Sequence, residues 1–128
     1  MQYEYFYGTQ AEQFSFYRIP KALFTEPNFR ELSTDAKVLY GILLDRMSLS
    51  LKNQWLDGQN KVYIIFTVEE IMDALNCANQ KATRLMVELE KQAGLIERKR
   101  QGLGRPNLIY VKNFAATIND KSCEKGDS

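Results

Sequence analysis

The sequence predicts an α+β domain that is mostly helical and carries a small antiparallel sheet, in the arrangement called a winged helix-turn-helix. Three observations between Thr67 and Val111 support this fold class: two amphipathic segments separated by a short turn, a hairpin pattern directly after them, and basic residues around the tip of that hairpin. In a winged helix-turn-helix the second helix is shaped to enter the major groove of DNA. The order of elements therefore predicts a function as well as a fold.

Aromatic side chains dominate the amino-terminal segment, residues 1–17. Several of them alternate with other residues, which is typical of short extended segments with one aromatic face. Two interpretations stay open, because such rings can complete a hydrophobic core or form part of a dimer contact. The rings belong to Tyr3, Tyr5, Phe6, Tyr7, Phe14, Phe16 and Tyr17.

A short helix and then the longest helix of the chain are expected between residues 18 and 50. Pro20 stands at the start of the short helix, where its missing amide donor costs nothing. Ser33 or Thr34 can cap the long helix, and Asp35 suits the positive end of its dipole. An apolar stripe along this helix would form the scaffold of the core, and it comprises Ala36, Leu39, Tyr40, Leu43 and Met47.

A turn-rich loop between Lys52 and Lys61 precedes a run of strand-forming residues at 62–66. This run predicts a strand that joins the sheet of the hairpin. Trp55, which stands in the loop, either plugs the underside of the domain or stacks on a base. The first role is the more common one for an isolated tryptophan beside a leucine.

Two helices are predicted on either side of a tight turn at residues 77–79. Thr67 can cap the first of them, and the free amides of that helix terminus could face a phosphate. Asn79 is expected to cap the second helix, which would cover residues 80–93. Gly94 suits the left-handed conformation that commonly ends a helix.

The second helix has one apolar face, formed by Ala82, Leu85, Met86 and Leu89 at helical spacing. Near its amino end the exposed residues are types that donate hydrogen bonds to base edges and phosphates. Any amphipathic helix carries some basic residues on its polar face, so this helix alone does not decide the function. The predicted contacts of the recognition helix are Asn79, Gln80, Lys81, Thr83 and Arg84.

The hairpin tip carries four cations and no acid between residues 98 and 107, a segment called the wing from here on. A hairpin needs glycine at its tip but does not need this charge, which binding to phosphates would explain. The alternative is a solvated hairpin whose cations keep an edge strand from aggregating. The wing residues predicted to contact DNA are Arg98, Lys99, Arg100, Gln101, Arg105 and Asn107.

The distribution of charge favours this interpretation more than the total does. The chain of 128 residues has a net charge of only +1. Between residues 79 and 112, however, eight cations stand against three carboxylates, which gives +5 there and leaves −4 for the remainder. Phosphate binding is local and depends on the charges that face the DNA backbone, so the asymmetry supports a nucleic-acid surface.

Several other classes of protein are disfavoured by composition. The chain has no histidine and only two cysteines, Cys77 and Cys123, so we expect no metal site and no cofactor. Without a phosphate-binding glycine-lysine motif or clustered carboxylates, we do not expect an enzyme. The absence of a signal peptide and of a long apolar run predicts a cytoplasmic protein that makes no use of a membrane.

Four long runs resemble a known family: residues 16–24 (FYRIPKALF), 32–50 (LSTDAKVLYGILLDRMSLS), 62–71 (VYIIFTVEEI) and 94–114 (GLIERKRQGLGRPNLIYVKNF). Together these runs cover much of the chain between Phe14 and Phe114. They resemble the amino-terminal domain of RepA-type plasmid replication initiators of Gram-positive bacteria, the RepA_N family.

The resemblance implies a winged-helix domain that binds repeated sites on double-stranded DNA at a plasmid origin, as a homodimer. It also implies a separate carboxy-terminal domain, absent from this chain, that recruits host replication proteins. We therefore expect an amino-terminal segment at residues 1–17, a DNA-binding domain at 18–114 and a polar linker or tail at 115–128. Thr67 would contribute a phosphate contact beside the recognition helix.

Two other functions are compatible with the residues themselves. The same fold serves transcriptional repressors, which bind a palindrome over a promoter instead of origin repeats. Alternatively, the domain is a protein-interaction module whose basic wing meets an acidic partner.

Overall fold

The computed structural model describes residues 2–8 and 13–115, and Cys123 and almost all of the predicted tail lie outside this range. Six helical segments precede a two-stranded antiparallel sheet in the described residues. The elements are α1 (Ala22–Thr25), η2 (Pro27–Phe29), α2 (Thr34–Lys52), α3 (Val68–Leu75), α4 (Asn79–Val87), η3 (Glu88–Gln92), β1 (Ile96–Lys99) and β2 (Leu108–Val111). The predicted fold class, mostly helical with a small antiparallel sheet, is confirmed.

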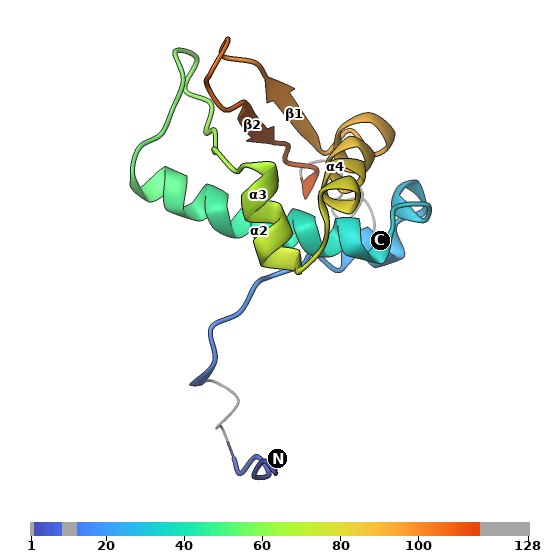
Figure 1. The fold of residues 1–128 in the computed structure, drawn as a ribbon. Coiled ribbons are helices and arrows are strands. Elements are labelled where there is room, and N and C mark those ends of the chain that lie inside the picture. Colours follow the sequence, from blue (N-terminus) through green and yellow to red (C-terminus); the bar gives the residue numbers. More distant parts are fainter. Residues whose placement is uncertain (1, 9–12, 116–128) are drawn as a thin grey trace, which may run out of the picture.

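Helix α2 runs through the domain, with α3 and α4 packed on it and the hairpin β1–β2 above α4 (Figure 1). Its buried side chains include Leu39, Tyr40 and Leu43, which meet Ile71 from α3 and Leu85 from α4 in one hydrophobic core. Ser33 caps α2, since its hydroxyl accepts a hydrogen bond from the Ala36 amide at 3.2 Å. Of the two caps that the sequence allows, the structure uses Ser33.

Two further contacts fix α2 within the domain. The Tyr40 hydroxyl donates to the Lys112 carbonyl at 2.7 Å, and burial raises the pKa of Tyr40 to about 12. Gly41 lies against the chain at residues 18–19, where an added Cβ would stand 2.8 Å from Ile19 Cγ1 and 3.0 Å from the Arg18 carbonyl oxygen. Glycine at this position therefore permits the close approach of the segment that enters the domain.

The predicted strand at residues 62–66 is wrong in extent. Only Ile64 pairs with the sheet, through two backbone hydrogen bonds of 2.9 Å with Ile109, and Val62 makes a single bridge to Leu56. Antiparallel continuation of the Ile64–Ile109 pair would place Val62 opposite Val111 in β2, but Val62 bridges the loop residue Leu56 instead. The run is an extended segment attached to the sheet at one residue.

The loop between α2 and this extended segment is held by Asp57. Its carboxylate accepts from the Lys61 and Gln59 amides at 2.9 and 2.8 Å and from the Tyr110 hydroxyl at 2.9 Å. These hydrogen bonds, that from the Lys61 amide above all, lower the pKa of Asp57. Trp55 does not plug the domain as expected, because it is 41% exposed and stacks on the Tyr63 ring instead.

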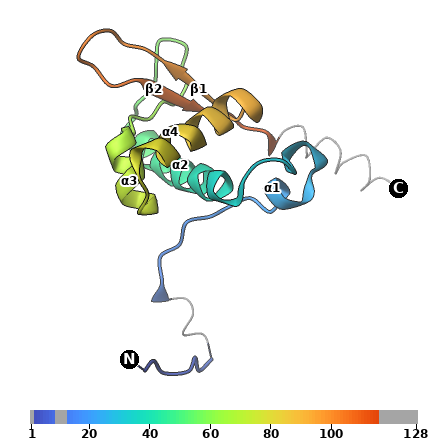
Figure 2. The same ribbon diagram turned by 45° about the vertical axis from the view of Figure 1, so that its right-hand side comes forward.

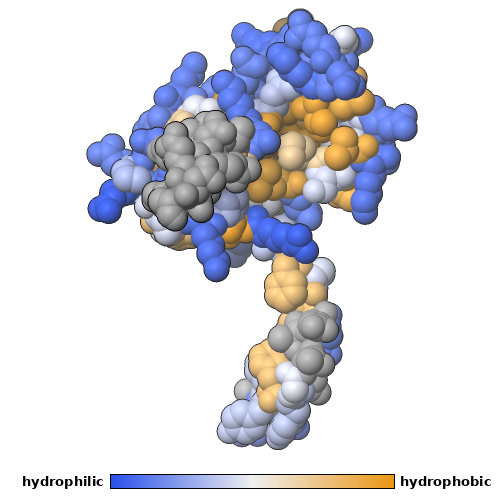
Figure 3. All heavy atoms as spheres, turned by 180° about the vertical axis from the view of Figure 1, so that it is seen from behind, coloured by the Kyte–Doolittle hydropathy of each residue, from blue (hydrophilic) through white to orange (hydrophobic). Residues whose placement is uncertain are grey.

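The aromatic rings of the amino-terminal segment do not complete the core. All seven are exposed, and the segment projects from the body of the domain (Figures 1, 2 and 3). Phe14 packs edge-on against Phe6 and Phe16, with ring centroids 6.1 and 6.2 Å apart. These three rings contact one another, and none of the seven aromatic residues belongs to the buried core.

Candidate nucleic-acid interface

The first turn of α3 is closed by its own side chains. The Thr67 hydroxyl accepts from the Glu70 amide at 3.2 Å, and the Thr67 amide donates to the Glu70 carboxylate at 3.0 Å, which together form a capping box. This confirms Thr67 as the cap. It also occupies the Thr67 amide, so a phosphate at this terminus would meet the amides that follow it, beside the carboxylates of Glu69 and Glu70.

The turn between α3 and α4 covers residues 76–78, one position earlier than the sequence suggested. Asn76 ends α3 in the left-handed conformation, with φ of 52°. The extended residue before α4 is Ala78, so the prediction that Asn79 caps this helix is wrong. Asn79 is the first helical residue, and its side-chain oxygen accepts from the Thr83 hydroxyl at 3.5 Å.

The polar face of α4 is open to solvent at Gln80, Thr83 and Arg84. Lys81 is different, since its ammonium group lies 2.7 Å from the Asp35 carboxylate at the start of α2. The two side chains are 42% and 50% exposed, and so exposed a pair contributes little to stability. A DNA phosphate can therefore take the place of Asp35.

The apolar face of α4 is buried as predicted, but the helix does not continue regularly to residue 93. A π-helical turn, η3, follows α4 directly and ends before Gly94, whose φ is +66°. Glu88 in this turn is buried and accepts from the amide and the hydroxyl of Ser33, the latter at 2.9 Å. The carboxyl end of the recognition helix is thereby fixed to the amino end of α2.

The wing tip is a preformed loop. Gly102 and Gly104 have positive φ, and the Gln101 side-chain amide donates to the Pro106 carbonyl at 2.8 Å. All the predicted contact residues between Lys99 and Asn107 are exposed: Lys99, Arg100, Gln101, Arg105 and Asn107. The tip thus presents cations and amides to solvent on a loop whose shape is already set.

Arg98 does not share this exposure. Its guanidinium group lies 2.8 Å from Glu90 in η3, and the two side chains are only 25% and 18% exposed. Burial alone would raise the pKa of Glu90, but hydrogen bonds from the Arg98 side chain and amide outweigh it and leave the pKa lowered. The wing segment itself contains no acidic residue, but the fold places Glu90 of η3 against Arg98 of the wing.

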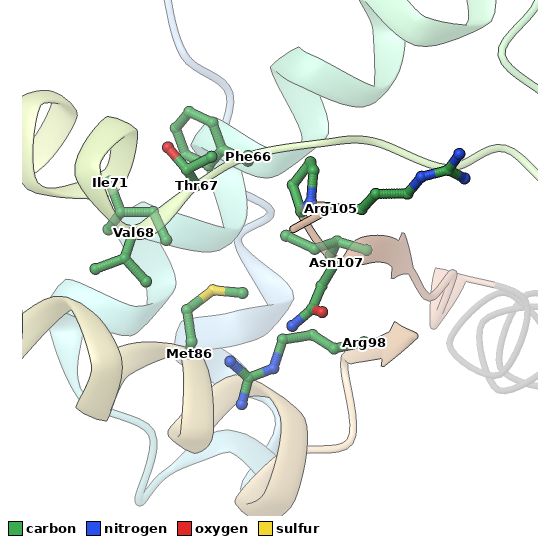
Figure 4. A pocket seen from close by; sticks show the side chains of 10 residues that line it. Phe66, Thr67, Val68, Ile71, Met86, Arg98, Arg105 and Asn107 are labelled. Atoms are coloured by element: carbon green, nitrogen blue, oxygen red, sulfur yellow. The ribbon is translucent and has the colours of Figure 1, made fainter. Parts of the chain in front are cut away.

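A hollow of about 260 Å³ lies where α3, α4 and the base of the wing meet (Figure 4). In the close-up, the Arg98 and Asn107 side chains extend along one side of it and the Arg105 guanidinium group points away. Of the predicted contact residues, the hollow brings together Thr67 at the start of α3 and Arg98, Arg105 and Asn107 of the wing, whereas α4 contributes the buried Met86. It is lined by Phe66, Thr67, Val68, Ile71, Met86, Arg98, Arg105, Pro106, Asn107 and Ile109.

Within residues 2–8 and 13–115, no group of three potential metal ligands occurs, and Cys77 is a free thiol. No helix there has both the length and the hydrophobicity needed to cross a bilayer.

Comparison with known proteins gives one family and one curated relative. The family described as "Replication initiator protein A (RepA) N-terminus" matches residues 15–125. A "41 kDa protein" of Lactobacillus helveticus is 31% identical over 111 residues, which are 87% of this chain and 30% of the relative. The chain thus spans about 30% of the length of that protein.

Three solved structures are similar over nearly their whole length. A structure described as "N-Terminal domain of DNA binding protein" is 36% identical, with a TM-score of 0.72 and coverage of 99% of this chain and 98% of that one. A structure described as "Structure of Rep-DNA complex" is 36% identical, with a TM-score of 0.72 and coverage of 98% of both chains. A structure described as "Structure of MDR initiator" is 39% identical, with a TM-score of 0.71 and coverage of 98% of this chain and 99% of that one. The resemblance found in the sequence is confirmed, and this chain belongs to the RepA_N family, whose model describes the amino-terminal part of replication initiator protein A.

Proposed function

We propose that this domain binds double-stranded DNA, with α4 in the major groove and the wing on the adjoining backbone, and that it acts in the initiation of replication. The observation that carries the proposal is that the polar face of α4 and the cationic wing are both exposed on elements that meet at one hollow, which α4 lines through Met86. A structural neighbour that is 36% identical is described as a Rep-DNA complex, which supports the same use of this domain. Membership of the initiator family supports replication as the process.

The finer proposal is sequence-specific binding to repeated sites at a plasmid origin. Gln80, Thr83 and Arg84 are exposed on α4 and suit base edges, whereas Lys99 and Arg100 suit phosphates. Selection from a random duplex pool, followed by footprinting on the DNA of the parent replicon, tests this proposal. Tandem protected repeats within an origin would support an initiator, and a single palindrome over a promoter would indicate a repressor.

Two substitutions separate recognition of bases from attraction to phosphates. We expect Arg84→Ala to reduce discrimination between the selected and a random duplex by about 1–3 kcal/mol for each base that the arginine reads. Arg100→Ala should weaken binding to all duplexes alike and reduce the salt slope by about one. If both variants weaken binding to selected and random DNA equally, the division of roles is wrong, and if the wild type binds no duplex at low salt, the domain is a protein-interaction module.

We further propose that the domain acts as a homodimer, with the aromatic amino-terminal segment in the contact. Its rings are exposed on a segment that projects from the body, and aromatic side chains are enriched in interfaces (Figure 3). Removal of residues 1–13 should convert the dimer to a monomer, as judged from the mass in solution, and should weaken binding to the selected duplex. A truncated protein that remained a dimer with unchanged affinity would contradict this role. Host replication proteins are proposed to bind a part of the protein beyond this chain, in keeping with its 30% coverage of the relative.

A further inference from the structure

The π-helical turn η3 directs two carboxylates to two different parts of the domain. Residues two apart differ by about 200° around the axis of an α-helix, and by less in the wider π-helical turn, so in both cases they lie on nearly opposite sides. Glu88 accordingly bonds to Ser33 at the start of α2, and Glu90 bonds to Arg98 at the base of the wing. The carboxyl end of the recognition helix is therefore tied on one side to the body and on the other to the wing.

The contact between Glu90 and Arg98 uses both carboxylate oxygens. Arg98 Nη2 and Nε donate to Oε1 at 2.8 and 3.0 Å, and the Arg98 amide donates to Oε2 at 3.2 Å. Because one of these three hydrogen bonds comes from the backbone amide, Glu90 holds strand β1 itself as well as the Arg98 side chain. A charged pair with this geometry, largely shielded from solvent, costs more to separate than an exposed ion pair.

The register of the sheet explains why the Arg98 amide is available. Arg98 stands opposite Ile109, whose amide and carbonyl both bond to Ile64 on the other side of β2. Arg98 is therefore in a pair without mutual hydrogen bonds, and its amide faces the outer edge of β1. Glu90 satisfies this edge amide. Side chains alternate between the two faces of β1, so Arg98 lies on the same face as the buried Ile96. Lys99 lies on the opposite face.

The hollow shows why this tie matters. The hollow lies between the wing base at Asn107 and the first turn of α3 at Thr67 and Val68 (Figure 4). The wing thus lacks close packing against α3 at this level. The contact of Arg98 with Glu90 bridges the wing base directly to the end of the recognition helix.

We propose that Glu90 is a positioning residue for DNA recognition, which holds the wing at a fixed angle to α4 by engaging Arg98, and that Arg98 does not contact phosphate. This inference rests on the proposed DNA-binding function. The wing cations that face DNA are then Lys99, Arg100 and Arg105. Recognition helix and wing dock as one unit, so a loosened wing loses discrimination between sites and not only affinity.

The test measures affinity for the selected duplex and for a random duplex over a range of salt concentrations. We expect Arg98→Gln and Glu90→Gln to leave the salt slope unchanged and to reduce the ratio of selected to random affinity about fivefold or more, the lower end of coupling between distinct sites. Lys99→Gln, the matched control on the opposite face of β1, should reduce the slope by about one and leave the ratio unchanged.

Two results would overturn the proposal. Arg98→Gln reduces the salt slope by about one if Arg98 contacts a phosphate, and in that case Glu90→Gln binds every duplex more tightly because it releases the cation. If fully folded Glu90→Gln kept the same ratio of selected to random affinity, the contact between Glu90 and Arg98 would contribute to stability alone and not to recognition.

A measurement without DNA separates this inference from the proposed function. In the free protein, Glu90→Gln should speed amide hydrogen exchange at Arg98 and along β1, whereas Glu97→Gln, an exposed neighbour on the same strand, should not. Equal exchange in the two variants would refute the positioning role. Wild-type protein that bound no duplex would instead refute DNA binding.

Discussion

The buried carboxylate of Glu88 gives the sharpest prediction about stability. Glu88 lies 8% exposed at the end of the recognition helix and accepts from both the amide and the hydroxyl of Ser33, the residue that caps α2. The negative charge thus stands at the positive end of the α2 dipole. Glu88→Gln keeps the size of the side chain and one acceptor oxygen, but removes the charge.

The magnitude follows from the interactions that change. A hydrogen bond to a charged group contributes about 1.5–3 kcal/mol, whereas a neutral one contributes about 0.5–1.5 kcal/mol. Loss of the interaction with the helix dipole adds about 0.3–1 kcal/mol. We therefore expect Glu88→Gln to lower the free energy of unfolding by about 2 kcal/mol, a large fraction of the stability of a small domain.

Urea unfolding followed by circular dichroism measures this difference, provided that the m-value stays constant. Glu97→Gln is the matched control, because it removes the same charge from an exposed position on β1 and should change stability by less than about 0.5 kcal/mol. Equal midpoints for the two variants would show that the hydrogen bonds between Glu88 and Ser33 contribute nothing net, and the argument from burial and dipole would fail.

Two further substitutions test the packing around α2. Gly41→Ala should lower the free energy of unfolding by about 1 kcal/mol, since overpacking against Ile19 costs about 1–3 kcal/mol and the gain in helix propensity is about 1 kcal/mol. Gly58→Ala, which meets nothing within 4 Å, is its control in the same urea titration. Tyr40→Phe should cost about 0.5–1.5 kcal/mol at neutral pH through loss of the bond to the Lys112 carbonyl. The pKa of Tyr40 is raised from 10.0 to about 12 on folding, so its contribution is complete below pH 10 and is lost as pH rises towards 12. Stability curves that fall equally steeply in wild type and Tyr40→Phe over that range would contradict this assignment.

Apart from the cap of α4, features decided by neighbouring residues could be predicted from the sequence. Thr67 with Glu70 three residues later forms a capping box, and Gly94 adopts the left-handed conformation that its place after the helix requires. Ser33 caps α2 through the Ala36 amide, again within one turn. The apolar spacing in α4 likewise determined which face is buried. Each of these depends on interactions within a few positions, and such interactions are visible in a linear pattern.

Features decided by distant partners could not be predicted in the same way. The run at residues 62–66 has strand-forming residues, but whether it becomes a strand depends on which distant segments its residues meet: Ile64 meets Ile109 in β2, whereas Val62 meets Leu56 in the loop. Trp55 was expected inside, and its actual neighbour is Tyr63 across the loop. The amino-terminal rings follow the same rule, because their pattern shows an aromatic face without showing what covers it.

From the sequence alone, the cations of the wing and those of α4 all look equally available to DNA. The exposure of the ion pairs that they form in the structure distinguishes them. Lys81 and Arg98 each meet a carboxylate from another element, Asp35 and Glu90. The Lys81 pair is about half exposed and contributes little, so a phosphate can replace Asp35 without leaving a buried charge behind. Removing Arg98 from Glu90 would leave a shielded carboxylate and an edge amide unsatisfied together. We therefore expect DNA to recruit Lys81 but not Arg98, in which case a count of basic residues overestimates the charge that the wing offers to the backbone.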